Sequence, residues 1–199
     1  MTKRRVVVTG MGIVAPVGNT LKLAWDNIVA GRSAIGPITT FDPAAFPTRF
    51  GGMIRDLDIS EYLEPKEARR MDNFIQYGYA ASAQAIKDSG LVVDEENAHR
   101  IGVAMGAGIG GLDTIQSNHF KLIEAQGPRK VSPFFVPASI INMISGHVSI
   151  NFGLKGPNLA LVTACTTSTH SIAIATRLIQ YGDADVMVAG GAEQAINPL

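Results

Sequence analysis

Four short apolar runs, each leading into glycines or other small residues, constrain the fold of this chain more than any other feature. They read VVVTGMG, IGVAMGAG, LALVTAC and VMVAGG, and we assign strands to Arg5–Thr9, Arg100–Met105, Leu159–Thr163 and Asp185–Ala189. Short runs that are rich in β-branched residues and bounded by turn residues are typical of buried strands. Helix-length segments separate them, and this alternation predicts an α/β fold with a mainly parallel sheet.

The segments between these strands carry the end signals of helices. Asp72 is a suitable N-terminal cap and Gly90 a suitable C-terminal stop for one of them. The inward face of that helix is small, with Gly78, Ala81 and Ala85, so a neighbouring segment can approach it closely. The helices are expected from Asn19 or Thr20 to Ala30, from Asp72 to Ser89, from Leu112 to Ala125, from Pro137 through Val148, and from Cys165 to Tyr181.

Charge and composition exclude several classes of protein. The chain has 17 basic and 17 acidic residues, so its net charge is zero and gives no sign of a nucleic-acid or membrane partner. No stretch reaches the roughly 18 apolar residues of a membrane span, and the N-terminus lacks the apolar segment of a signal peptide. One cysteine excludes an internal disulfide and a cysteine-rich metal site, so we expect a cytoplasmic protein without a metal.

That cysteine stands where a predicted strand meets a predicted helix. In ALVTACTTSTHSIAIATRLI, Cys165 opens a helix that has no charged residue before Arg177. Unpaired amides and the helix dipole at a helix N-terminus stabilise anions, lower the pKa of a thiol and favour the nucleophilic thiolate. A backbone amide at such a turn can also form half of an oxyanion hole. The alternative is an inert core cysteine, since free cysteine is among the most buried residue types, and the residues alone leave both interpretations open.

Two glycine-rich turns fit the dinucleotide-binding fingerprint. GAGIGG at 106–111 follows a predicted strand, and residues 10–15 fit a looser form. The fingerprint also requires an acidic residue about 20 positions later, at the end of a second strand. Position 130 is Lys130, and both Asp26 and Glu124 lie in predicted helices. The sequence therefore favours tight turns that let backbone segments pack closely over a nucleotide site.

Several blocks of the sequence resemble the β-ketoacyl-acyl-carrier-protein synthases, and most of all their elongating type II subfamily. VTACTTSTHSI followed by GDADVMVAGGAE is similar to the active-site region, and VVVTGMGIVAPVGN, MDNFIQYG and GPRKVSPFFVP are similar as well. The resemblance covers essentially all 199 residues and implies a thiolase-like layered α/β/α/β/α fold. Residues 1–199 would be the N-terminal half. Because GGAEQAINPL breaks off in an apolar loop, we expect a longer protein.

The resemblance implies roles for three groups of residues. Cys165 would be the nucleophile that accepts the acyl group, with its backbone amide in the oxyanion hole. The acyl pocket would involve Gly108, Ile109 as its gate, Gly110, and the adjacent aromatics Phe134 and Phe135, one of which would reach the pocket of the other subunit of a homodimer. Acidic acyl carrier protein would dock on the basic residues Lys66, Arg69, Arg70, Arg129 and Lys130, which composition alone would leave simply solvated.

The implied reaction is the decarboxylating Claisen condensation of an acyl-enzyme with malonyl-acyl-carrier protein in fatty acid elongation. It requires no metal or organic cofactor, because the phosphopantetheine arrives on the carrier-protein substrate. A polyketide-type ketosynthase would share Cys165, whereas a noncatalytic partner subunit would usually lack it.

The family completes its site with two histidines from the C-terminal half, and none of His99, His119, His147 and His170 stands in such a motif. The 199-residue piece alone is therefore expected to be inactive. His99 and His119 are predicted at the surface and His147 in the core. His170 lies five residues after Cys165, which on a helix is about 140° around the axis, so we expect it to pack or hydrogen-bond rather than to pair with the thiol.

Overall fold

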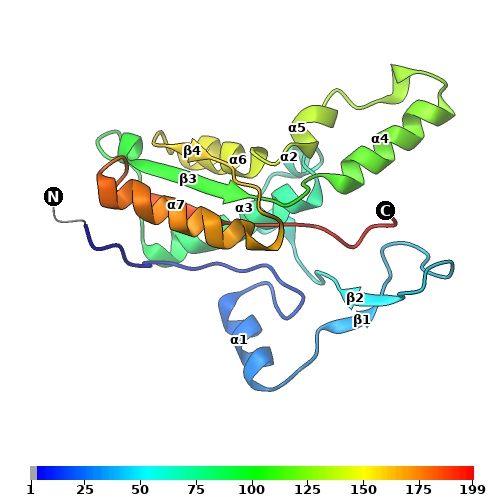
Figure 1. The fold of residues 1–199 in the computed structure, drawn as a ribbon, viewed down its shortest axis with the longest axis horizontal. Coiled ribbons are helices and arrows are strands. Elements are labelled where there is room, and N and C mark those ends of the chain that lie inside the picture. Colours follow the sequence, from blue (N-terminus) through cyan, green and yellow to red (C-terminus); the bar gives the residue numbers. More distant parts are fainter. Residues whose placement is uncertain (1–3) are drawn as a thin grey trace.

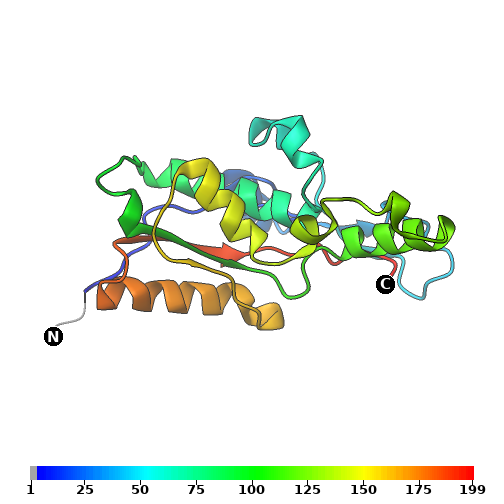
Figure 2. The ribbon, with the colours of Figure 1, turned by 90° about the horizontal axis from the view of Figure 1, so that it is seen from above.

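The computed structural model describes residues 4–199. They form three layers, in which a parallel sheet lies between two layers of helices. The sheet has the order β4 (Asn158–Leu159), β3 (Ile101–Gly106) and β5 (Val186–Gly191), with β3 parallel to both neighbours. Helix α7 (Thr167–Tyr181) covers one face, while α3 (Asn73–Ser89) and α6 (Met143–Phe152) cover the other (Figure 2). The predicted α/β fold with a parallel sheet is confirmed.

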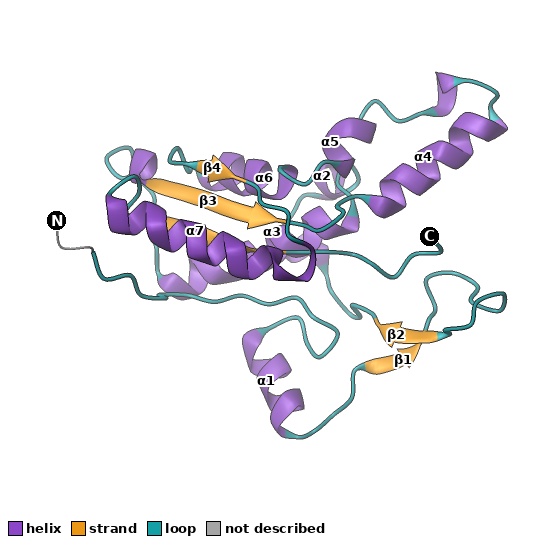
Figure 3. Ribbon diagram, in the orientation of Figure 1, coloured by secondary structure: helices purple, strands orange, loops and turns teal. Residues whose placement is uncertain are grey.

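Two further parts extend from these layers (Figures 1 and 3). One is an arm made of α4 (Leu112–Glu124), the short turn η3 (Pro128–Lys130) and α5 (Phe135–Ser139). The other contains α1 (Leu21–Val29) and an antiparallel pair, β1 (Ile35–Pro37) with β2 (Phe50–Gly52). The remaining elements are α2 (Pro65–Ala68) and the 3-10 turns η1 (Ile59–Glu61), η2 (Ala98–Arg100) and η4 (Ala164–Thr166). Within the described range, every helix is too short or too polar to cross a membrane.

Local signals placed the ends of the first two long helices correctly. The hydroxyl of Thr20 accepts a hydrogen bond from the amide of Leu23 at 3.3 Å, so Thr20 rather than Asn19 caps α1. The carboxylate of Asp72 caps α3 through the amide of Phe74, and Gly90 ends α3 in the left-handed conformation with φ +67°.

The core lies between the sheet and the α3–α6 layer. Its fully buried side chains include Phe74 and Ile75 from α3, Val103 from β3, and Ile144 from α6. The buried hydroxyl of Ser145 accepts from the amide of Met105 at 2.9 Å and lies 2.6 Å from the carbonyl oxygen of Leu159. It therefore ties α6 to β3 and to the end of β4.

The strand predicted at Arg5–Thr9 is wrong. The segment is extended but lies outside the described sheets, and Val7 and Val8 are 61% and 77% exposed. The chain that follows it lies along α3, where the amide of Met11 donates to the Asp88 carboxylate at 2.9 Å. A Cβ at Gly12 would lie only 2.0 Å from the carbonyl oxygen of Ala81. Ala81 and Ala85 of the expected small face thus receive a backbone segment, in which the amides of Met11 and Ile13 donate to side chains of α3 rather than to a strand. Gly78 lies against Ile144 of α6 instead.

The single helix predicted from Pro137 through Val148 is broken into α5 and α6. Pro137 lies within the first turn of α5, and Ile140 leaves the helical conformation with ψ 140°. The carbonyl oxygen of Ser139 accepts a hydrogen bond from the amide of Gly111 at 3.0 Å, in place of a bond within a continuous helix. A contact from a distant loop therefore sets the break.

The third predicted strand, Leu159–Thr163, is shorter than expected. Only Leu159 of this range belongs to β4, which pairs with Val103 and Ala104 of β3. The carbonyl oxygen of Leu159 is directed to the Ser145 hydroxyl, and the chain then leaves the sheet toward a tight turn.

Candidate active site

Cys165 lies in the 3-10 turn η4, immediately before α7. Helix α7 begins at Thr167, two residues later than predicted, so the thiol stands in front of the helix rather than inside it. Ala164 has φ +50°, a left-handed conformation that residues other than glycine rarely adopt. Cys165 is exposed in the described chain and lies outside its core.

Hydrogen bonds hold this turn from both sides. The amide of Thr163 donates to the hydroxyl of Thr167 at 2.8 Å, and the amide of Thr166 donates to the carbonyl oxygen of Thr163 at 3.0 Å. Nδ1 of His170 lies 2.9 Å from the hydroxyl oxygen of Thr163. His170 therefore makes a hydrogen bond beside the turn, as expected.

The glycine-rich loop after β3 surrounds a carboxylate of the chain itself. The amides of Gly108 and Ile109 donate to Oε2 of Glu193 at 2.6 and 2.7 Å, and the amide of Gly110 donates to Oε1 at 3.0 Å. The backbone amides that would cradle a phosphate in a nucleotide-binding protein are thus occupied by Glu193. This arrangement argues against the dinucleotide alternative for GAGIGG.

The glycine-rich loop also lies against the cysteine turn. A Cβ at Gly108 would lie 2.8 Å from Oε2 of Glu193 and 3.4 Å from Cα of Ala164. Gly110 has φ +91°, and Ile109 between them is 59% exposed. The structure therefore brings Gly108 next to the turn that carries Cys165, with Ile109 and Gly110 following in the same loop. Sequence reasoning expected this only through the family resemblance.

Glu193 is the site residue that sequence reasoning missed. It lies in the quoted GGAE block, but nothing in its immediate neighbours indicates a partner more than 80 positions away. Only the pairing of β3 with β5, in which Gly106 lies opposite Gly191, brings Glu193 to the loop.

The aromatic pair and the first basic group meet at α5 and α2. Phe134 is exposed and Phe135 is half-buried. The guanidinium carbon of Arg70 lies 4.6 Å from the centroid of the Phe134 ring, a cation–π contact. Lys66, Arg69 and Arg70 are all exposed in and beside α2.

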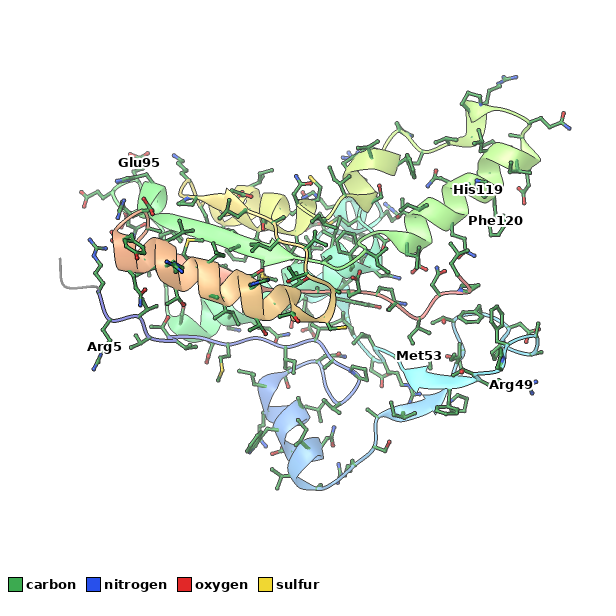
Figure 4. All side chains as sticks on the ribbon, viewed as in Figure 1. Arg5, Arg49, Met53, Glu95, His119 and Phe120 are labelled. Carbon is green, nitrogen blue, oxygen red and sulfur yellow. The ribbon has the colours of Figure 1, made fainter. Side chains whose placement is uncertain are left out.

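The second basic group is not brought to the first. Arg129 and Lys130 lie in η3, at the outer end of the arm, whereas α2 lies beside the main layers (Figures 1 and 2). His119 and Phe120 lie on α4 of the same arm (Figure 4), and His119 is exposed, as is His99. His147 is half-buried on α6 rather than in the core, and this burial lowers the pKa of its imidazole.

A buried carboxylate anchors the arm to the layers. Asp72 is only 5% exposed, and it accepts from the amide of Thr114 at the start of α4 at 2.8 Å as well as from Phe74 at the start of α3. Desolvation by burial raises the pKa of Asp72 in spite of these hydrogen bonds. One side chain therefore caps two helices.

A hollow of about 390 Å³ lies between residues 12–16 and 191–196, with Tyr77 and Glu193 in its wall. Cys165 does not line it. The geometry of the turn, rather than this hollow, identifies the candidate nucleophile.

Comparison with known proteins agrees with this geometry. Residues 3–199 match the family described as β-ketoacyl synthase, N-terminal domain. The 3-oxoacyl-(acyl-carrier-protein) synthase 2 of Vibrio cholerae is 60% identical over 199 residues, which are 100% of this chain and 48% of that protein. The synthase of the same name from Synechocystis is 48% identical over the same coverage. The chain thus spans about half the length of these curated relatives.

Solved structures show the same fold. The ishigamide ketosynthase/chain length factor superposes with a TM-score of 0.87 at 25% identity, covering 97% of this chain and 48% of that one. A β-ketoacyl synthase from Burkholderia phymatum gives 0.82 at 26% identity, covering 100% and 48%. The fold is therefore the thiolase-like ketosynthase fold, and with a match across residues 3–199 the chain belongs to the β-ketoacyl synthase family, in its N-terminal domain.

Proposed function

We propose that this chain is the nucleophile-bearing N-terminal half of a 3-oxoacyl-acyl-carrier-protein synthase, an acyltransferase of fatty acid elongation. The observation that carries the proposal is the exposed Cys165 in the turn before α7. Relatives that are 47–60% identical and bear the name 3-oxoacyl-(acyl-carrier-protein) synthase 2 support it.

In the proposed reaction, the sulfur of Cys165 attacks the thioester carbonyl of an acyl-carrier protein. The carbon–sulfur bond to the carrier breaks, and the acyl group remains on Cys165. Malonyl-carrier protein then loses carbon dioxide, and the resulting carbanion attacks the acyl-enzyme carbonyl. The Cys165 thiolate leaves, and the product is a 3-oxoacyl-carrier protein two carbons longer.

The turn supplies one kind of stabilisation in this scheme. The backbone amide of Cys165, just before α7, would form half of an oxyanion hole. No metal or organic cofactor enters the scheme, because the phosphopantetheine belongs to the substrate. The two histidines of the family would come from outside this chain.

The loop beside the turn provides the proposed wall of the acyl pocket. Gly108 lies against Ala164, and Ile109 and Gly110 follow it in the loop, so an acyl chain on Cys165 would leave the sulfur close to this loop. Ile109 is the proposed gate. Phe134 and Phe135 lie at the start of α5. One of them would line the acyl pocket of the other subunit in a homodimer.

Acyl carrier protein is the proposed partner, in a cytoplasmic setting. A structural neighbour with a TM-score of 0.81 is titled a type II polyketide-synthase acyl-carrier protein in complex with its ketosynthase. In this chain the exposed Lys66, Arg69 and Arg70 form the proposed docking surface, with Arg129 and Lys130 as a second contact. An acidic carrier protein would be attracted to such groups by charge.

Mass spectrometry of the full-length protein that contains this chain tests the proposal. After incubation with an acyl-carrier protein, we expect the mass of one acyl group on Cys165, and no adduct in Cys165→Ser. An intact, folded protein that acquires no acyl group, or acquires it at another residue, would contradict the assignment.

A polyketide-type ketosynthase is the second candidate, favoured by the likeness to the ishigamide ketosynthase/chain length factor. The two candidates differ in their products. With malonyl-carrier protein and no reductase present, a fatty-acid enzyme releases the product of one condensation, whereas a polyketide enzyme adds several units to the unreduced chain. Product masses distinguish them.

A further inference from the structure

The carboxylate of Glu193 accepts hydrogen bonds from three successive backbone amides, those of residues 108–110, at 2.6, 2.7 and 3.0 Å. Hydrogen bonds to an ionised acceptor are stronger than those between neutral groups. Consecutive amides that converge on one anion form a concave anion-binding site. The nucleophile and the carrier-docking surface described above do not account for this arrangement.

Glu193 extends the connection between β3 and β5 beyond the end of the sheet. Strands β3 and β5 pair from Ile101 with Val186 to Gly106 with Gly191, and the amide of Ala192 then donates to the carbonyl oxygen of Gly106 at 3.0 Å. Beyond that point the backbones no longer pair. From there on, the side chain of Glu193 binds the amides of residues 108–110, in the loop that follows β3.

The glycine-rich loop is held at a second point and lies against the cysteine turn. The amide of Gly111 donates to the carbonyl oxygen of Ser139, and the position of Gly108 lies within van der Waals reach of Ala164. Between these points Ile109 is 59% exposed. The position of Ile109 relative to the sulfur is therefore set by the backbone, and the backbone is held by Glu193.

We propose that Glu193 is a positioning residue for the acyl-binding loop: by holding the amides of residues 108–110, it sets how Ile109 selects between acyl chains on Cys165. This inference rests on the proposed function. A steric wall discriminates between short and long chains only while it keeps its place. Release of the loop should therefore flatten the acyl-length preference without changing the reactivity of the thiol.

Two substitutions in the full-length protein test the inference. Glu193→Gln keeps the shape but removes the charge, and its amide group turns an N–H donor toward one of the three backbone donors. Glu193→Asp keeps the charge on a shorter side chain and should therefore retain part of the hold on the amides of residues 108–110. Glu95→Gln is the matched control, since Glu95 is exposed and lies at the far end of the molecule near the start of β3 (Figure 4).

Amide hydrogen exchange without substrate is the first measurement. Loss of one charge-assisted hydrogen bond should speed exchange in the peptide that contains residues 108–110 about tenfold in Glu193→Gln. The effect should be smaller in Glu193→Asp, and Glu95→Gln should match the unsubstituted protein. Unchanged exchange in Glu193→Gln would refute the loop anchor, whatever the reaction is.

The second measurement compares the rates at which short and long acyl-carrier thioesters acylate Cys165, with iodoacetamide alkylation as a report on the thiol. In Glu193→Gln, the ratio of the two acylation rates should move several-fold toward one, while alkylation stays unchanged. If the loop amides exchange faster in Glu193→Gln but the ratio of the two acylation rates stays unchanged, the positioning role is refuted. If Cys165 in the unsubstituted protein takes no acyl group, the proposed function fails instead, and hydrogen exchange still decides the anchor.

Discussion

A carboxylate joins β3 to β5 at each end of the sheet, but its partners differ. At the amino end, Asp185 receives the side chains of Arg100 at 3.0 Å and Arg4 at 2.5 Å, all partly exposed. At the carboxyl end, Glu193 receives only backbone amides. Ion pairs between long side chains at a surface contribute little and are screened by salt. Backbone donors in a turn have few other conformations, so they define a position more closely.

The difference in carboxylate partners follows the position of the candidate site in the sheet. The carboxyl ends of parallel strands are where ligand sites form in α/β folds, and Cys165 lies at this end. An anchor made of backbone leaves the side chain of Ile109 free to contact a substrate. At the amino end, partly exposed ion pairs of Asp185 with Arg100 and Arg4 join the strands.

Gly108→Ala should give the largest effect and would break the carboxyl-end anchor directly. The new Cβ would lie 2.8 Å from Oε2 of Glu193, so the carboxylate or the loop must shift. We expect acylation of Cys165 to fall at least about tenfold, with a stability loss of about 1–3 kcal/mol, as in other overpacked sites. Acylation rates and urea unfolding measure the two effects.

Gly127→Ala is the control for that change, because nothing lies within 4 Å of the Cβ position of Gly127 and its backbone is extended. It should leave acylation and unfolding nearly unchanged. Equal acylation rates and equal unfolding free energies in the two alanine variants would show that crowding at Gly108 affects neither acylation nor stability.

Charge reversal at the docking surface asks whether surface charge on α2 matters more than surface charge at the amino end of the sheet. Lys66→Glu combined with Arg69→Glu should raise the KM for acyl-carrier protein several-fold at low salt and leave kcat unchanged, because electrostatic attraction governs encounter. The increase should diminish at high salt. Lys155→Glu, on an exposed residue away from α2, is the control. Unchanged KM in the double variant would remove α2 from the docking surface.

The smallest effect is expected from Asp185→Asn, which tests the amino end. Hydrogen bonds from Arg100, and then from Arg4, lower the pKa of Asp185 from 3.8 to about 2. A carboxyl group whose pKa is lowered in the fold adds stability that is complete above pH 3.8 and is lost as the pH falls through about 2.

Because these groups are about half exposed, Asp185→Asn should cost no more than about 1 kcal/mol at neutral pH. The difference from the unsubstituted protein should vanish as the pH falls toward 2, which chemical unfolding at several pH values would reveal. A difference that persists undiminished at the lowest pH would show that the ion pairs are not its source.

The sequence by itself determined the features that depend on neighbours within a turn or two. Thr20, Asp72 and Gly90 set helix ends through contacts a few residues away, and apolar β-branched residues marked β3 and β5. The position of Cys165 between a strand segment and a helix was also readable, because a strand–turn–helix junction is a local pattern.

The tertiary structure alone decided the features that depend on distant partners. Arg5–Thr9 has the composition of a strand, but a strand needs a paired neighbour, and the chain that follows this segment packs along α3 instead. The break between α5 and α6 depends on Gly111, far from Ser139 in sequence. Glu193 reaches the glycine-rich loop only because β5 lies beside β3, and the order of strands in a sheet is set by packing of the whole domain rather than by any local run of residues.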